Sequence, residues 1–201
     1  MIVVGLTGSI GMGKSVLAAQ FRRLKIPVHE ADRTVHEILG TSEAVKKAFP
    51  SAIANKKIDR KKLGQMVYAD PKARKKLESI LHPLVRADRK RWLGQMRAQG
   101  HAMAVIDVPL LFETGLDAWC DHVVCATAPA MVQKARVLKR PGMTEERLRA
   151  ILQIQMPDAQ KRKKSDTVIN TARGYAATYR DLKKLVASLK NPPVLVDDDA
   201  E

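Results

Sequence analysis

The chain has 201 residues, of which 45% are hydrophobic and 28% are charged, a balance typical of a globular protein with one sizeable core. Its net charge of +15 comes from 36 Lys+Arg against 21 Asp+Glu and makes nucleotides, nucleic acids and acidic membranes candidate partners, with a solvated basic surface as the alternative. No apolar run approaches the roughly 18 residues of a membrane span, and an aromatic content of 4% argues against a base-stacking platform.

The first predicted elements are a strand, a glycine-rich loop and a helix. Ile2–Leu6 is a short apolar run that predicts a buried parallel strand. Gly8–Ser15 follows it and matches the phosphate-binding pattern G-x-x-x-x-G-K-[ST] at all four fixed positions. Apolar residues then recur with helical spacing, at Val16, Leu17, Phe21 and Leu24. A glycine-rich turn could match by chance, but strand, loop and helix in this order favour a true P-loop.

Each fixed position of this loop has a physical role. Gly8 and Gly13 permit backbone angles that a Cβ would forbid, and Gly11 adds further freedom. The loop can therefore curl so that successive N–H groups point at phosphate oxygens. Lys14 supplies a mobile positive charge for the β- and γ-phosphates of a nucleotide, and Ser15 offers a hydroxyl to Mg²⁺. The N-terminus of the following helix adds its dipole to this anion site.

A second strand is predicted at Pro27–Glu30, ending near Asp32. Because ligands bind at the carboxyl ends of parallel strands, we expect Asp32 to face the same crevice as the P-loop. A carboxylate there can accept a proton from an attacking hydroxyl. The alternative is that Asp32 caps a helix beginning at Arg33, which would be the better interpretation without the P-loop. Beside a phosphate site, the catalytic role is favoured.

The stretch from Arg33 to Ala102 is longer than one crossover helix requires, so it predicts a helical insertion. Its patterns predict helices at about 33–40, 42–49, 59–68, 70–81 and 83–99, with Pro83 kinking or restarting the last one. His82 precedes this proline, and a lone histidine in such a place is most often structural. Basic residues coat the polar faces, namely Lys72, Arg74, Lys75, Lys76, Arg86, Arg89, Lys90 and Arg91.

A third strand from Ala102 to Ile106 ends in Asp107, as in a Walker B arrangement whose carboxylate holds Mg²⁺, often through water. Many buried strands end in Asp, so this signal depends on its position at the crevice. A fourth strand is predicted at Asp121–Thr127. The two cysteines, Cys120 and Cys125, lack metal spacing and are interpreted as reduced packing residues.

A helix after the fourth strand carries Arg136 and Arg140 on one face, and Pro141-Gly142 ends it. Thr144 then caps a second helix, which stops at Gln155–Pro157. Two helices joined by a tight turn with arginines beside it are typical of a mobile lid. A solvated surface hairpin would show the same pattern and is the alternative.

A fifth strand at Asp166–Asn170 and a closing helix at 176–189 complete the predicted core, and the acidic tail at 197–201 is expected to fray. The fold class is therefore α/β: a P-loop NTPase fold with a five-stranded parallel sheet flanked by helices, a helical substrate-binding insertion and a helical lid. This combination is typical of a small-substrate kinase. A switch GTPase would normally carry N-K-x-D for guanine, and Asn55-Lys56-Lys57-Ile58 fails at its last position.

Several stretches resemble the dephospho-CoA kinase family, over nearly the whole chain. They are Gly5–Gly8 with the P-loop, Ala31-Asp32, Ile58–Arg60 with Leu63-Gly64, Leu81–Arg86, Asp107–Glu113, the lid, Gln155–Pro157 with Lys161-Arg162, and Asp166–Ile169. The P-loop identifies only a superfamily. The sequence PLLFE at Pro109–Glu113, combined with HPLVR at His82–Arg86, is much more specific.

The resemblance implies ATP-dependent phosphorylation of the ribose 3′-hydroxyl of dephospho-coenzyme A, with Mg²⁺ as cofactor. It implies catalytic roles for Asp32, as base or orienter of the hydroxyl, for Lys14, and for Arg140 as the lid arginine that covers ATP. The residues implied to bind ATP are Gly8, Ser9, Ile10, Gly11, Met12, Gly13, Lys14, Ser15 and Val16. Those implied to bind the acceptor are Thr7, Asp32, His82, Arg86 and Leu111. Ser15 and, through water, Asp107 would bind the metal.

The expected organisation is a nucleotide-binding core of residues 1–32, 102–130 and 158–201, an acceptor domain of residues 33–101 and a lid of residues 131–157. We expect a cytoplasmic location, since the N-terminus enters a strand without a basic leader. We also expect a monomer that binds ATP and dephospho-CoA and binds neither nucleic acid nor a membrane. Two alternatives stay open: another nucleoside or nucleotide kinase of the same architecture, and a nucleic-acid-binding protein switched by ATP.

The chain departs from the family pattern at a few positions. Ser9 stands where the family usually has Gly, and Met12 where it has a small residue. After the last strand, Asn170-Thr171 replaces the usual Asp-Asn, which leaves the contact with adenine open.

Overall fold

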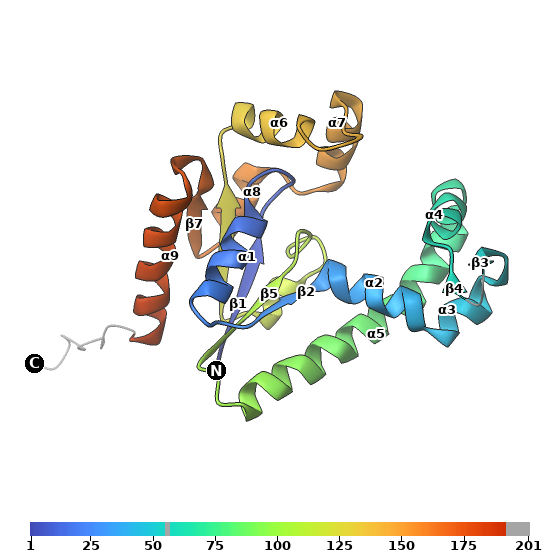
Figure 1. Cartoon of the computed structure of the whole chain (residues 1–201), viewed down its shortest axis with the longest axis horizontal. Helices are drawn as coiled ribbons and strands as arrows, with labels where there is room; N and C mark the ends of the chain where they lie inside the picture. Colours follow the sequence, from blue (N-terminus) through green and yellow to red (C-terminus); the bar gives the residue numbers. More distant parts are fainter. Residues whose placement is uncertain (55–56, 192–201) are drawn as a thin grey trace, which may run out of the picture. The chain divides into compact units, whose positions relative to one another are not determined.

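The computed structural model describes residues 1–54 and 57–191, which fold as two compact units (Figure 1). Residues 1–28 and the described residues from 100 onward form the first unit, and His29–Gln99 form the second. Each unit has its own cluster of buried apolar side chains. The acidic tail expected to fray at 197–201 lies outside the described residues.

The first unit is built on a five-stranded parallel sheet in the order β2-β5-β1-β6-β7, which confirms the predicted fold class. The strands of the sheet are β1 (Ile2–Thr7), β2 (Val28–Glu30), β5 (Met103–Asp107), β6 (His122–Thr127) and β7 (Thr167–Asn170), and the last two residues of β2 are counted with the second unit. Central β1 pairs with β5 so that Leu6 lies beside Asp107. Because parallel strands end at the same edge of a sheet, this register places Asp107 next to the loop that leaves β1.

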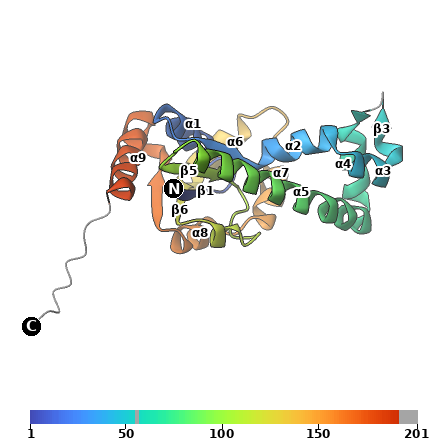
Figure 2. The same cartoon turned by 90° about the horizontal axis from the view of Figure 1, so that it is seen from below.

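Helices cover both faces of this sheet. α1 (Lys14–Arg23) and α9 (Tyr175–Lys190) lie on one side and α8 (Asp158–Lys164) on the other (Figure 2). The two helices between β6 and α8 are α6 (Ala130–Leu138) and α7 (Glu145–Ile154).

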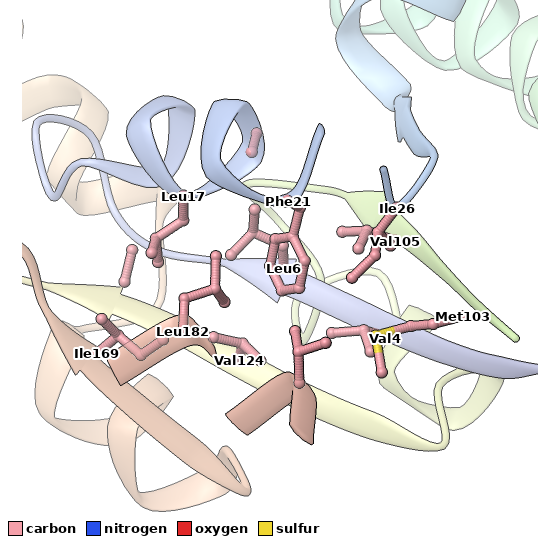
Figure 3. Packing of buried hydrophobic residues seen from close by; sticks show 13 residues of the cluster. Val4, Leu6, Leu17, Phe21, Ile26, Met103, Val105, Val124, Ile169 and Leu182 are labelled. Atoms are coloured by element: carbon pink, nitrogen blue, oxygen red, sulfur yellow. The ribbon is translucent and has the colours of Figure 1, made fainter. Parts of the chain in front are cut away.

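The core of the first unit lies between the sheet and the α1–α9 face. Side chains alternate along β1, so that Val4 and Leu6 share one side. Figure 3 shows Leu6 in one cluster with Phe21 of α1 and Leu182 of α9. All three side chains are fully buried. Truncating a buried phenylalanine such as Phe21 to alanine typically costs about 3–5 kcal/mol of stability.

The second unit is mainly helical. Its elements are α2 (Ala31–Thr41), α3 (Glu43–Ala48), the antiparallel pair β3 (Ile53–Ala54) and β4 (Lys57–Ile58), α4 (Arg60–Ala69) and α5 (Pro71–Ala98). The side chains of Asp59 and Asp70 accept backbone hydrogen bonds and cap α4 and α5. Val45, Leu63 and Leu81 belong to its buried core. No helix in either described part of the chain is both long and apolar enough to cross a membrane.

The structure corrects the prediction at Pro83. Residues 70–81 and 83–99 were expected to form two helices, but α5 runs through Pro83 without interruption. A proline in a helix removes one hydrogen bond, here to the carbonyl of Ser79. Leu77, Ile80 and Leu81 anchor the preceding turns in the apolar core, and we attribute the continuity of the helix to this packing.

The β3–β4 pair and helix α8 have no counterpart in the prediction. The β3–β4 pair is too short to show an alternating pattern. Helix α8 carries a run of basic residues, so it lacks the apolar periodicity that identifies a helix. Its one fully buried side chain is that of Lys161, whose ammonium group donates a hydrogen bond to the Pro109 carbonyl.

Cys120 and Cys125 both belong to the first unit, and neither forms a disulfide. Burial raises the pKa of the Cys125 thiol to about 11, so it stays protonated at neutral pH. Cys120 Sγ lies 2.7 Å from the position that a Cβ on Gly5 would occupy. Both cysteines therefore act as packing residues, as expected.

Candidate active site

The glycine-rich loop joins β1 to α1 with the backbone that its glycines permit. The φ angle is +150° at Gly8, +76° at Gly11 and +87° at Gly13. A Cβ on Gly8 would lie 2.7 Å from the carbonyl oxygen of Ala126, and one on Gly13 would lie 2.5 Å from Thr171 Oγ1. Backbone angle and available space therefore both require glycine here, as predicted.

The loop lysine and the carboxylate at the end of β5 form an ion pair, in which Lys14 Nζ donates to Asp107 Oδ1. Both groups are largely shielded from water, with side-chain exposures of 16% for Lys14 and 8% for Asp107. Both residues were predicted as site residues from their separate motifs. The register of β1 and β5 brings them together.

The residues that flank the loop differ in exposure. Ser15 and Val16, in the first turn of α1, are exposed. Thr7 and Leu111 are fully buried; Thr7 Oγ1 donates to the Pro109 carbonyl at 3.2 Å. These two side chains support the end of β1 from within, and their burial argues against the direct side-chain contact with an acceptor that was expected.

Sequence reasoning missed the side chains that hold the outside of the loop. The N–H of Ile10 donates to Gln155 Oε1 at 3.0 Å, and the Ile10 carbonyl accepts from Gln133 Nε2 at 2.8 Å. The hydroxyl of Thr171 donates to the Met12 carbonyl at 2.8 Å. Gln155 belongs to a family motif, which could have indicated it. Gln133 is a glutamine on a helix, which carries no sequence signal.

The predicted lid comprises α6, α7 and the turn between them. Thr144 caps α7, as predicted, and Lys134 of α6 pairs with Glu145 of α7 at 2.7 Å. Because Gln133 bonds to the Ile10 carbonyl, α6 supports the glycine-rich loop and is not a freely solvated hairpin. Arg140, just after α6, has an exposed side chain.

An ion pair between the fully buried Lys161 and the partly shielded Glu113 supports the segment that follows β5. Lys161 Nζ lies 2.9 Å from Glu113 Oε1 and donates to the Pro109 carbonyl at 2.6 Å. The Glu113 carboxylate also accepts from the Met156 N–H at 2.7 Å. Burial opposes ionisation of Glu113, but the hydrogen bonds from Lys161 and Met156 outweigh it and hold the pKa below its ordinary value of 4.5. The network thereby fixes Met156 next to Gln155, which bonds to the loop.

Three of the residues predicted to act on the acceptor lie in the second unit. Asp32 is exposed in the first turn of α2, and the N-cap position of that helix is Glu30. The capping alternative for Asp32 is therefore wrong, since this residue already lies inside the helix. His82 and Arg86 are both exposed and stand four residues apart on α5, hence on the same face.

Comparison with known proteins gives one consistent family. The model of the dephospho-CoA kinase family matches residues 2–176. The chain is 48% identical over 192 residues to the dephospho-CoA kinase of Mesorhizobium japonicum, covering 94% of this chain and 98% of the relative. It is 47% identical to that of Paramagnetospirillum magneticum, covering 100% of this chain and 97% of the relative.

Solved structures agree with the sequence matches. TT1252 from Thermus thermophilus has a TM-score of 0.82 at 33% identity, covering 94% of this chain and 97% of that one. Dephospho-CoA kinase from Campylobacter jejuni has a TM-score of 0.72 at 27% identity, covering 94% and 96%. Shikimate kinase from Bacteroides thetaiotaomicron, at 16% identity and a TM-score of 0.52 over 92% of this chain and 98% of that one, shares the fold alone.

Proposed function

The chain belongs to the dephospho-CoA kinase family, and we propose that its P-loop site transfers the γ-phosphoryl group of ATP to the ribose 3′-hydroxyl of dephospho-coenzyme A. The chain is a kinase of coenzyme A biosynthesis with ATP as the phosphoryl donor. The observation that carries the assignment of the site is the Lys14–Asp107 pair, formed at a P-loop in a chain that matches the family throughout. Phosphoryl transfer depends on positioning and charge neutralisation more than on covalent participation by the protein.

In this proposal the first unit binds ATP. Amides of the loop and the Lys14 ammonium hold the phosphates, and the N-terminus of α1 adds its dipole. Arg140, exposed after α6, covers ATP and stabilises charge on the transferred group, as an arginine supplied in cis. Residues 131–157 act as the lid, whose closure keeps water from competing as an acceptor.

The side chains available for Mg²⁺ fit the chemistry of that ion. Ser15 and Asp107 offer a hydroxyl and a carboxylate, and Mg²⁺ usually takes one or two protein oxygens together with substrate phosphates and waters. Across residues 1–54 and 57–191, no group of three or more His, Cys, Asp or Glu side chains could hold a metal ion. The proposed site therefore rests on these two residues and on ATP itself. When bound, Mg²⁺ neutralises charge on the phosphates.

The second unit receives the acceptor in this proposal. The exposed carboxylate of Asp32 accepts the proton of the ribose hydroxyl or orients that hydroxyl toward the γ-phosphate. His82 and Arg86 bind anionic groups of dephospho-CoA from the exposed, basic surface of α5. We further propose a cytoplasmic monomer whose acceptor domain is residues 33–101 and which uses neither nucleic acid nor a membrane as a partner.

A panel of acceptors tests this function. The protein is mixed with ATP, Mg²⁺ and, in separate reactions, dephospho-CoA, adenosine, AMP or shikimate, and release of ADP is followed. Among these acceptors, we expect only dephospho-CoA to give rapid turnover. Phosphorus NMR of the product should assign the new phosphate to the 3′ position. Rapid turnover with another acceptor would reassign the substrate. Retention on a polynucleotide at physiological salt without any kinase turnover would contradict the enzymatic function.

A further inference from the structure

Three consecutive carbonyl oxygens of the P-loop accept hydrogen bonds from side chains outside it. The donors come from two places, helix α6 and the short 3₁₀ helix η3 (Thr171–Arg173) that follows β7. The bonds are Gln133 Nε2 to the Ile10 carbonyl at 2.8 Å, Arg136 Nη1 to the Gly11 carbonyl at 3.4 Å, and Thr171 Oγ1 to the Met12 carbonyl at 2.8 Å. We call Gln133, Arg136 and Thr171 the carbonyl brace.

Peptide geometry connects this brace to the phosphate site. In a trans peptide the N–H of the next residue points opposite to the carbonyl. Bonds that hold the three carbonyls outward therefore turn the N–H groups of Gly11, Met12 and Gly13 toward the inside of the loop. The Met12 N–H donates to the Ser9 carbonyl at 3.1 Å. The brace thus aims chiefly the amides of Gly11 and Gly13 at a bound phosphate.

Thr171 and Arg136 form the tightest part of the brace. Arg136 Nη1 donates to Thr171 Oγ1 at 2.8 Å, and its Nη2 donates to the Thr171 carbonyl at 3.0 Å. The same hydroxyl donates to Met12, so it acts as donor and acceptor at once. Thr171 is 5% exposed, and its side chain occupies the space that a Cβ on Gly13 would need. The hydroxyl therefore has one fixed orientation, set by the guanidinium behind it.

We propose that Thr171 and Arg136 are positioning residues for ATP: they set its affinity by fixing the inward orientation of the loop amides. The inference rests on the proposed function, because it presumes that this loop binds ATP phosphates. It also gives a role to Thr171, which stands where the family pattern has a different residue. Arg136 is distinct from Arg140, since its guanidinium binds the protein backbone and a side chain, whereas Arg140 is exposed.

Two substitutions of Thr171 separate its hydrogen bonds from its volume. Thr171→Val keeps the shape and removes both bonds of the hydroxyl, and Thr171→Ser keeps the hydroxyl. We expect Thr171→Val to raise the Kd for ATP, measured by calorimetry, by about tenfold, as the loss of a buried hydrogen-bonding group suggests. Thr171→Ser should bind ATP within about twofold of wild type. The KM for dephospho-CoA should stay unchanged in both variants.

A third variant tests whether Arg136 acts by geometry or by charge. Arg136→Lys keeps the positive charge but cannot bond Thr171 with two nitrogens. We expect it to weaken ATP binding by about as much as Thr171→Val. Wild-type ATP affinity in Arg136→Lys would overturn the positioning role of Arg136. Unchanged ATP affinity in Thr171→Val, or an equal loss in Thr171→Ser, would overturn that of Thr171.

These outcomes differ from failure of the proposed function. Suppose that the wild-type protein binds ATP but does not phosphorylate dephospho-CoA, and that Thr171→Val binds ATP more weakly. The assignment of the acceptor would then be wrong, and the role of the carbonyl brace in ATP binding would still be supported. Thermal melting of each variant without ATP provides the control for folding. A variant that melts as wild type does and shows a raised Kd has lost loop geometry and kept its fold.

Discussion

The two units hold their proposed site residues in different ways. In the first unit, the P-loop is bonded to side chains from α6, from η3 and from Gln155, which directly follows α7, and Lys14 is paired with Asp107 in a shielded position. In the second unit, Asp32, His82 and Arg86 are exposed on helix surfaces. Folding itself therefore sets the geometry of the proposed phosphate site, whereas the proposed acceptor residues are accessible charged side chains. Substitutions in the side chains that hold the P-loop should therefore act through geometry, and substitutions of Asp32, His82 and Arg86 through charge.

The largest effect among three tests of this comparison is expected at the phosphate site. Lys14→Ala removes the charge that stabilises the transferred phosphoryl group, so we expect kcat to fall by about 10²–10³-fold, as for the loss of one electrostatic contact to a transition state. Steady-state ADP release measures it. The matched control is Lys183→Ala, an exposed lysine on α9, which should retain wild-type activity. Full activity of Lys14→Ala would contradict the proposal that phosphoryl transfer takes place at the P-loop of the first unit.

A smaller effect is expected on the acceptor side. Arg86→Ala should raise the KM for dephospho-CoA by about tenfold, the effect of losing one hydrogen bond to a charged group, and leave the KM for ATP unchanged. A higher salt concentration should reduce the difference in the KM for dephospho-CoA between Arg86→Ala and wild type, because salt screens exposed charges. Arg97→Ala, at an exposed arginine on the same helix, is the control and should behave as wild type. If Arg86→Ala raised the KM for ATP and left the KM for dephospho-CoA unchanged, the proposed assignment of ATP to the first unit and of the acceptor to the second would be contradicted.

The smallest effect concerns stability and contrasts two carboxylates. Glu113 is bonded to buried Lys161 and has a lowered pKa, so its ionised form stabilises the fold above its unfolded pKa, and this contribution is lost as pH falls through the folded value. We expect Glu113→Gln to lower the melting temperature by a few degrees at pH 7, about 1 kcal/mol or less for a partly shielded pair, and the difference should shrink below about pH 4.

The matched substitution for this contrast is Glu37→Gln in the second unit. Glu37 pairs with Arg33 at 2.8 Å, but both side chains are exposed, so no measurable change in melting temperature is expected at any pH. Equal effects of the two substitutions would show that the interior network around Glu113 adds nothing beyond a surface ion pair.

The sequence predicted the parts of the fold that follow simple periodicity. The apolar strand at Ile2–Leu6 and the helix that carries Leu17 and Phe21 are present with nearly the predicted limits. The continuous α5 was not predictable, because packing outweighs the local effect of Pro83. Helix α8 was missed because its buried side chain is that of a lysine, Lys161, which is held by hydrogen bonds and an ion pair. The helix therefore has no apolar periodicity in the sequence.

The candidate site shows the same limit. Gly8, Gly13 and Lys14 could be predicted because a local pattern requires them, and Asp107 because it ends a buried strand. The carbonyl brace could not be predicted, since its members are distant in sequence from the loop and meet it only after the sheet and helices are packed. Gln133 and Thr171 are ordinary residue types whose roles depend on one hydrogen-bond geometry.

The most direct test of the proposed chemistry is the rate of a single turnover in Asp32→Asn, measured beside its affinity for ATP. The substitution keeps the shape of the side chain and removes its ability to accept a proton, and Glu37→Gln on the same helix serves as the control. We predict ATP affinity within about twofold of wild type and a phosphoryl-transfer rate reduced by roughly a hundredfold or more. A rate equal to that of wild type would contradict the assignment of Asp32 as the group that acts on the acceptor hydroxyl.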